Sequence, residues 1–249
     1  MKIALVGNMN NNNFAMMRYF RDLGAVAHLL LNIDDGQGSL SHFRPQCDTW
    51  EIERWKPFIH QTSIPNAPVV GLDFPLSCLM SGRAFLRSLT GAQERWVSPV
   101  SRRRIRKAYA GYDRVVGSGI TPAAFDRAGQ RLDLFYPYAM GVEYLRTGEF
   151  TSHFEGRGLG RATLYRAIAR RQAAGIKAAR HVLNCDAGVT ERVLAEFGVR
   201  ARREAIPMVY AGGSAPAAAP SDHLEVAQDA IDRSDFCVWH HARLMWKRP

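Results

Sequence analysis

The chain has 249 residues, and its 33 Lys and Arg against 23 Asp and Glu give a formal net charge of +10. A hydrophobic content of 47% is that of an ordinary globular protein, which excludes disorder over most of the length. No stretch reaches the roughly 18 continuous apolar residues of a membrane-spanning helix, and the four scattered cysteines form no CxxC pair that would indicate structural zinc. We therefore expect a cytoplasmic protein without a bound metal, whose positive charge favours anionic partners.

The first 31 residues predict one strand, helix, strand unit. Residues 2–6 and 26–31 are apolar runs typical of buried strands, and residues 14–23 form the helix between them. The apolar residues of this helix recur every three positions: Phe14, Met17, Phe20 and Leu23. Gly24 is placed to end the helix as a C-cap glycine. A unit of this length predicts parallel pairing through a right-handed crossover.

The same alternation continues to about residue 210. Residues 34–66 predict a long irregular excursion with aromatic anchors, and residues 68–72 predict a short strand. Further helices are expected at 76–89, 102–110, 121–128, 160–178 and 187–197, and further strands at 113–117, 132–136, 181–185 and 204–210. The fold class we expect is α/β, with a Rossmann-like, doubly wound parallel sheet in one domain over residues 1–210.

Residues 211–221 differ in composition from the rest of the chain. They hold small residues and prolines without a periodic apolar face, which predicts a linker. Residues 222–249 contain a helical pattern and a strand-like run at 236–239, which predict the start of a second domain.

The first candidate site is the polar loop at residues 7–13, between the first strand and its helix. Ligands of open α/β sheets bind beyond the carboxyl ends of the strands, and helix-start amides with asparagine side chains suit a phosphate or sugar hydroxyls. The candidate substrate-binding residues here are Gly7, Asn8, Asn10, Asn11, Asn12 and Asn13. A polar turn with a helix cap is the alternative, because asparagine favours caps and tolerates left-handed conformations. The GxGxxG pattern is absent, which disfavours a dinucleotide.

Two later loops are expected to converge on the first. Ser118 and Gly119 follow a strand, and Tyr138, Gly141 and Glu143 follow the next one. The first four are candidate substrate-binding residues. Glu143 is the candidate catalytic residue, because a carboxylate there could orient a sugar hydroxyl or assist its deprotonation. A solvated loop carboxylate is the alternative for Glu143.

A basic run precedes the strand predicted at 113–117, and its positive residues are Arg102, Arg103, Arg104, Arg106 and Lys107. With Ile105 and Tyr109 as its apolar side, the run could form a short amphipathic helix that holds an anionic membrane surface. The alternative is a solvated basic face. Nucleic acid is not an expected partner, because no recognised binding module accompanies the charge.

Four segments together resemble a known family. Residues 1–24, 112–141, 170–186 and 206–210 are similar to the group 1 glycosyltransferases of bacterial surface-polysaccharide synthesis. The resemblance implies the GT-B fold, in which two Rossmann-like domains face a cleft, and it covers the first, acceptor-side domain. It also implies transfer of a sugar from a nucleotide sugar to a glycan or lipid-linked acceptor, with retained configuration and without a cofactor or metal.

The resemblance also bears on the end of the chain. It implies that Arg243 and Lys247 contact the donor diphosphate, and that a complete enzyme continues past Pro249. The chain is then expected to be the first half of a transferase with a truncated donor domain, which alone could be inactive. A non-catalytic Rossmann-like module that binds a sugar or nucleotide is the alternative.

Overall fold

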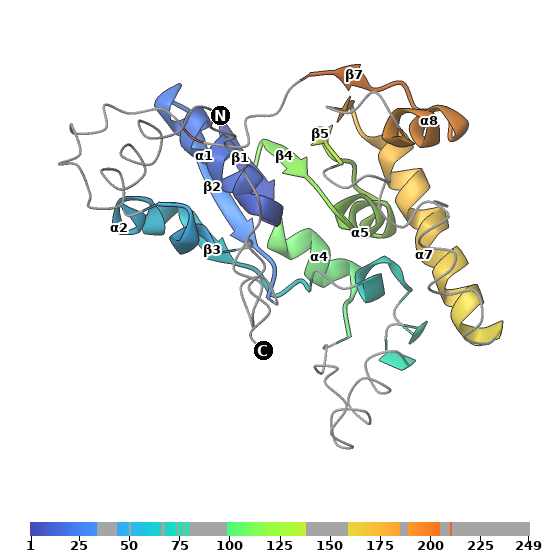
Figure 1. Ribbon diagram of the computed structural model, residues 1–249. Coiled ribbons are helices and arrows are strands. Elements are labelled where there is room, and N and C mark those ends of the chain that lie inside the picture. Colours follow the sequence, from blue (N-terminus) through green and yellow to red (C-terminus); the bar gives the residue numbers. More distant parts are fainter. Residues whose placement is uncertain are drawn as a thin grey trace, which may run out of the picture. The chain divides into compact units, whose positions relative to one another are not determined.

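The computed structural model describes residues 1–33, 44–49, 51–65, 68–73, 75–76, 78–79, 99–137, 159–184, 189–204 and 210. Its described strands form one parallel sheet in the order β3-β2-β1-β4-β5-β6-β7 (Figure 1). The strands are β1 (Lys2–Val6), β2 (Val26–Leu31), β3 (Ile59–Gln61), β4 (Arg114–Gly117), β5 (Leu134–Phe135), β6 (His181–Asn184) and β7 (Arg202–Arg203). This is the expected α/β, Rossmann-like, doubly wound arrangement. The linker and second domain expected over residues 211–249 lie outside the described residues.

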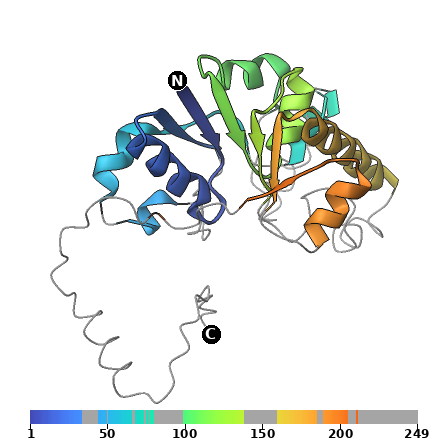
Figure 2. The same cartoon turned by 90° about the horizontal axis from the view of Figure 1, so that it is seen from above.

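Six helices and four 3₁₀ turns whose two ends are defined connect these strands in the described part. The helices are α1 (Asn12–Asp22), α2 (Ile52–Trp55), α4 (Arg102–Ala108), α5 (Thr121–Ala128), α7 (Leu159–Ala178) and α8 (Val189–Glu196). The 3₁₀ turns are η1 (Met9–Asn11), η3 (Pro45–Cys47), η4 (Lys56–Phe58) and η5 (Pro68–Gly71). Figures 1 and 2 show α1 and α2 toward the β2–β3 end of the sheet, and α7 and α8 toward the β6–β7 end.

The sheet separates two apolar layers, because successive side chains of a strand point to opposite faces. On β1, Ile3 and Leu5 belong to the layer that contains Phe14 and Met17 of α1 and Trp55 of α2. The alternate residues of β1 pack into the other layer with residues of α4, α5, α7 and α8, among them Ala4, Val6, Ile105, Phe125, Ile168 and Val193. The sheet is therefore covered on both faces, as the apolar runs of its strands predict.

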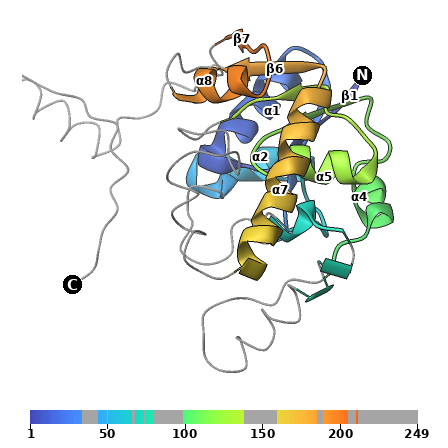
Figure 3. The ribbon, with the colours of Figure 1, turned by 90° about the vertical axis from the view of Figure 1, so that its right-hand side faces the viewer.

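Helices α5 and α7 cross at very close range (Figure 3). A Cβ atom built on Gly175 would lie 2.0 Å from the carbonyl oxygen of Pro122. One turn earlier, Gln172 accepts from the Ala123 N–H at 3.0 Å and donates to the Gly119 carbonyl at 2.9 Å. Helix α7 thus adds side-chain hydrogen bonds to backbone groups at the start of α5, where the Ala123 N–H also donates to the Ile120 carbonyl at 3.1 Å.

Helix α1 begins earlier than its apolar pattern predicts, at Asn12, and it ends as expected. Gly24 is left-handed, with φ +80°, and donates to Arg21 while Ala25 donates to Phe20. This pair of bonds is a Schellman motif. Leu23 is 82% exposed, although the pattern predicts it to be buried with Phe14. Nine residues at about 3.6 per turn amount to two and a half turns, so Leu23 lies opposite Phe14.

Three predicted elements differ from the structure. The strand predicted at 68–72 is the 3₁₀ turn η5, where Pro68 has no N–H to donate to a sheet. The excursion predicted at 34–66 contains β3, which has only three residues and so shows no readable alternation. Strand β7 comes just before the strand predicted at 204–210; Glu204 and Tyr210 are not in a strand, and the residues between them lie outside the described part of the chain.

Candidate functional site

Two of the loops expected to bind a ligand meet beyond the carboxyl edge of the sheet. Residues 7–13 follow β1, residues 118–119 follow β4, and these neighbouring strands continue the chain in opposite directions across the sheet. Ser118 Oγ donates to the Val6 carbonyl at 3.3 Å, and a Cβ on Gly7 would lie 3.5 Å from Ser118 Oγ. The loops therefore meet at the switch point, where open α/β sheets bind ligands.

The Asn13 side chain joins the ends of three strands. Its Nδ2 donates to the carbonyl oxygens of Val6 at 2.9 Å and Gly7 at 2.8 Å, and lies 3.5 Å from Ser118 Oγ. Its Oδ1 accepts from the Tyr136 hydroxyl at 2.8 Å. The residue is fully buried. An amide nitrogen has only two hydrogens to donate, and the Val6 and Gly7 carbonyls accept both of them. This geometry favours a structural role for Asn13 over the ligand contact expected from the sequence.

Asn8 and Asn11 organise the start of α1. Asn8 Nδ2 donates to Asn11 Oδ1 at 2.6 Å, and Asn8 Oδ1 accepts from the Phe14 N–H at 3.0 Å. The Asn12 N–H donates to the Met9 carbonyl. Two amides that could have bound a phosphate at this helix start are thus engaged within the protein, which makes a phosphate a poor ligand for this loop.

Left-handed backbone at two consecutive asparagines shapes the rest of the loop. Asn10 has φ +55° and Asn11 has φ +58°, a region that asparagine enters more readily than other non-glycine residues. Asn10 is half-buried, whereas Asn8, Asn11 and Asn12 are buried. The loop therefore exposes Asn10 and conceals the other asparagines of the run.

Asn12 is the asparagine whose side chain is least satisfied. Its residue is 3% exposed, and its Oδ1 is buried without a hydrogen-bond partner. An unsatisfied buried polar group costs about 1–3 kcal/mol unless a water or a ligand supplies a partner. Asn12 Oδ1 can thus accept a hydrogen bond from a donor such as a hydroxyl group.

Three more polar residues lie around the switch point and were not predicted from the sequence as site residues: Asn32, Thr121 and Tyr136. Asn32 follows β2 directly and lies with Nδ2 3.7 Å from a Cβ built on Gly7. Tyr136 follows β5, and Thr121 Oγ1 donates to the Ser118 carbonyl at 2.6 Å. Each comes within a few residues after an apolar strand, which is the signal that could have identified it.

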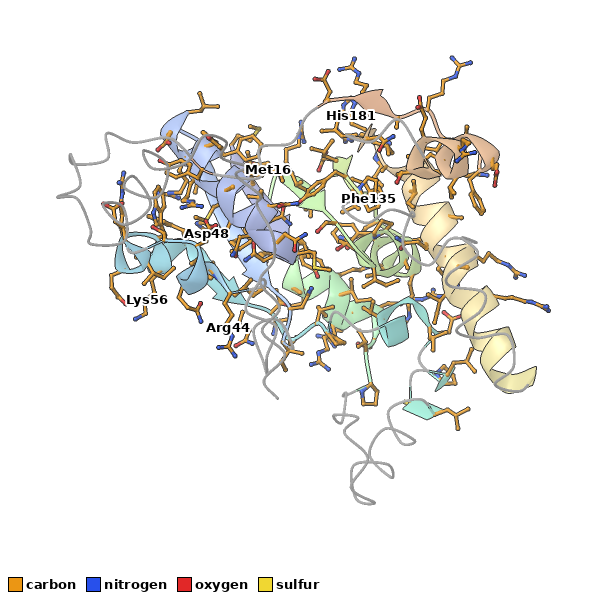
Figure 4. All side chains as sticks on the ribbon, viewed as in Figure 1. Met16, Arg44, Asp48, Lys56, Phe135 and His181 are labelled. Atoms are coloured by element: carbon orange, nitrogen blue, oxygen red, sulfur yellow. The ribbon has the colours of Figure 1, made fainter. Side chains whose placement is uncertain are left out.

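A buried cation lies further along α1. Arg18 forms an ion pair with Asp48. Figure 4 labels Asp48 between α1 and α2. The Arg18 guanidinium also lies over the rings of Phe14 at 4.1 Å and Tyr210 at 4.5 Å. Burial lowers the pKa of Arg18, and the Asp48 carboxylate opposes that shift. This cluster fixes α1, and with it the asparagine loop, against the segment ahead of α2.

Tyr210 makes the stability of this cluster depend on pH. Burial and a hydrogen bond donated to Asp22 at 2.6 Å raise the pKa of Tyr210 to about 12. A tyrosine pKa raised in the folded state contributes stability that is complete below the usual value near 10 and is lost as the pH rises toward 12. We expect Tyr210→Phe to remove one tyrosinate transition near pH 12 from the ultraviolet absorbance titration. A transition lost near pH 10 instead would contradict this arrangement.

The basic run forms α4, and its apolar residues do not face solvent. Ile105 and Tyr109 are buried in the core, so the apolar side expected to meet a membrane is already covered by the protein. Arg106 Nε donates to the Ala128 carbonyl at 2.6 Å, and Arg102 pairs with Asp73 at 3.4 Å. The membrane hypothesis is thus reduced to an electrostatic contact through the exposed cations of α4.

The remaining predicted site residues lie outside the described residues: Tyr138, Gly141, Glu143, Arg243 and Lys247. Within the described part of the chain, no three or more His, Cys, Asp and Glu gather in a way that could hold a metal ion. None of the described helices is long and apolar enough to cross a membrane.

No protein-family model matches the chain, and no curated protein or solved structure matches it.

Proposed function

We propose that this chain is the acceptor-side half of a glycosyltransferase that moves a sugar from a nucleotide sugar to a hydroxyl acceptor in surface polysaccharide or glycolipid synthesis. The acceptor is held at the switch point between β1 and β4. The proposal rests on the resemblance to group 1 glycosyltransferases and on the chemistry of the groups gathered at this edge.

The observation that carries the proposal is the uncharged, hydrogen-bonding character of the switch point. The side chains there are amides and hydroxyls, from Asn8, Asn10, Asn11, Asn12, Asn13, Asn32, Ser118, Thr121 and Tyr136. Sugar hydroxyls both donate and accept, so neutral amides suit them better than an excess of one charge. One amide oxygen, Asn12 Oδ1, still has no donor.

The residues divide into two roles. Asn8 and Asn13 hold the loop, because their hydrogen bonds go to the protein. Asn10 contacts the acceptor, because it is the accessible asparagine of the loop. Asn12 is buried beside it, and its unused oxygen accepts from an acceptor hydroxyl that enters the loop. Glu143 assists deprotonation of the acceptor hydroxyl, as a carboxylate in its loop could do. Arg243 and Lys247 bind the donor diphosphate, as the family resemblance implies.

The test is a pair of variants that separates folding from binding. Asn12→Ala removes an unsatisfied acceptor, so we expect the free energy of unfolding to stay within about 1 kcal/mol of the wild-type value. We expect its affinity for saccharides to fall about tenfold, the equivalent of one neutral hydrogen bond. A panel of mono- and disaccharides, nucleoside diphosphates and nucleotide sugars is titrated into labelled protein, with the asparagine side-chain amides observed by NMR.

Asn13→Ala is the matched contrast within the same loop. It leaves the Tyr136 hydroxyl and two carbonyls without their partner, so we expect a loss of about 2 kcal/mol of stability. The proposal fails if no saccharide shifts the Asn10 or Asn12 signals of the wild-type chain. Saccharide binding without transfer by a chain supplied with a donor domain would support the non-catalytic module instead.

A further inference from the structure

A pocket lies away from the switch point, between α4 and the neighbouring strands β2 and β3, of which β3 is the edge strand of the described sheet. It has a volume of about 480 Å³, within the range of small-molecule sites. Arg104 and Lys107 line it from α4, His60 lines it from β3, Ser63 comes from the segment after β3, and Tyr112 precedes β4. The pocket is thus formed by three separate segments of the chain.

The charged side chains that line the pocket in the described part of the chain are positive. Arg104 and Lys107 are cations, and none of the described residues that line it is acidic. Asp113, next to Tyr112 in sequence, does not line it and accepts instead from the Lys2 backbone N–H at 2.7 Å. An uncompensated pair of cations in a concave site concentrates anions.

His28 lies beside this pocket and is itself close to other basic groups. His28 Nδ1 lies 3.1 Å from the Tyr112 hydroxyl. Burial lowers the pKa of His28, and the positive groups around it lower that pKa further: His60, Lys2 and Arg21. The positive groups near His28 thus extend from the pocket to β1 and α1.

Arg104 is held in a fixed position by neutral acceptors. Its Nε donates to Ser63 Oγ at 3.0 Å, Nη2 donates to the Ser63 carbonyl at 2.5 Å, and Nη1 donates to the Pro99 carbonyl at 3.1 Å. These contacts use three of the five N–H donors of a guanidinium and leave two, and none of these described partners is a carboxylate. A guanidinium fixed in this way is preorganised for a phosphate, because little side-chain entropy is lost on binding.

We propose that the pocket between α4 and the β2–β3 edge binds the phosphate group of a phosphorylated molecule, through Arg104 and Lys107. The Ser63 hydroxyl and Tyr112 lie within the same lining. The volume exceeds that of a phosphate ion, so the rest of the molecule occupies the part lined by Leu30, Ala108 and Tyr112. This inference does not depend on the saccharide site, which is formed by other residues.

The experiment replaces chloride by inorganic phosphate at constant ionic strength and follows backbone amide signals by NMR. We expect saturable shifts at Ser63, Arg104 and Lys107 in the wild-type chain. Lys107 is exposed, so Lys107→Gln should fold normally. We expect this variant to bind phosphate about fivefold more weakly, the effect of losing one exposed charge pair.

Arg103→Gln is the matched control, because Arg103 is an exposed cation of the same helix that does not line the pocket. It should bind phosphate as the wild type does. Equal weakening by both variants, or no saturable shift in the wild type, would overturn the proposal.

A parallel titration identifies the source of the phosphate, with phosphatidylcholine vesicles that contain or lack phosphatidic acid. If vesicles with phosphatidic acid bind and Lys107→Gln weakens them more than Arg103→Gln does, the phosphate belongs to a lipid headgroup. If inorganic phosphate saturates the pocket and these vesicles do not bind, the phosphate belongs to a free molecule.

Discussion

Replacing Gly175 by alanine should lower the free energy of unfolding by about 3 kcal/mol, although alanine is the better helix former. A Cβ at this position would lie 2.0 Å from the oxygen and 2.4 Å from the carbon of the Pro122 carbonyl. These are backbone atoms at the start of α5, so no side-chain rotation relieves the overlap. Helices α5 and α7 must move apart, which also disturbs the Gln172 bonds to Gly119 and Ala123.

Denaturant unfolding of the wild type, Gly175→Ala and Ala174→Gly measures this effect. Ala174 is half-buried on the same helix, so its replacement by glycine should cost only the propensity difference of about 1 kcal/mol. A stabilised Gly175→Ala variant would mean that the two helices do not cross at this glycine. The variant also bears on the site, because Gln172 of α7 binds the carbonyl of Gly119 in the second loop.

The order of strands and helices could be predicted from the sequence, because most strands are apolar runs that lie between segments with a clear helical pattern. The bounds of β1 and β2 are those expected, and Gly24 ends α1 in the left-handed conformation expected of a C-cap glycine. Strand β3 could not be predicted, since three residues carry no alternation and its place depends on pairing with β2. Such pairing is a tertiary contact, which overrides weak local preference.

The location of the candidate site could also be predicted, but the role of each asparagine could not. The position of a polar loop after β1 follows from the strand pattern alone. Whether an amide faces the backbone or a ligand depends on two left-handed residues, Asn10 and Asn11, and on distant partners. Asn13 accepts from Tyr136, which is 123 residues further along the chain. No local pattern contains that information.

The replacement Arg18→Ala should cost about 3 kcal/mol of stability. Arg18 is 3% exposed and pairs with Asp48, whose side chain is 24% exposed. Removing one partner of a buried pair typically costs about 3–5 kcal/mol, and partial exposure of the carboxylate places this case at the lower end. The variant also loses the contacts of the guanidinium with the Phe14 and Tyr210 rings.

Arg21→Ala is the control for Arg18→Ala. Arg21 is half-buried on the same helix and lies 3.2 Å from the centroid of the Phe58 ring, but it forms no ion pair with another described residue. We expect its replacement to cost only about 1 kcal/mol. Equal losses for the two variants would mean that the ion pair with Asp48 adds nothing to the stability of α1.

A double-mutant cycle of Arg18→Met and Asp48→Asn separates charge from packing. Methionine keeps much of the apolar contact with Phe14 and Tyr210 but removes the charge, so the coupling energy reports the ion pair. Burial already raises the pKa of Asp48 against the opposing effect of Arg18. In Arg18→Met the opposing effect of the Arg18 charge is gone, so the Asp48 carboxyl should protonate at higher pH.

Because Asn12 lies at the start of the helix that this pair anchors, Arg18→Met should also weaken saccharide binding while leaving phosphate binding at Lys107 unchanged. Loss of both binding activities would show that the variant disturbs the whole sheet rather than α1.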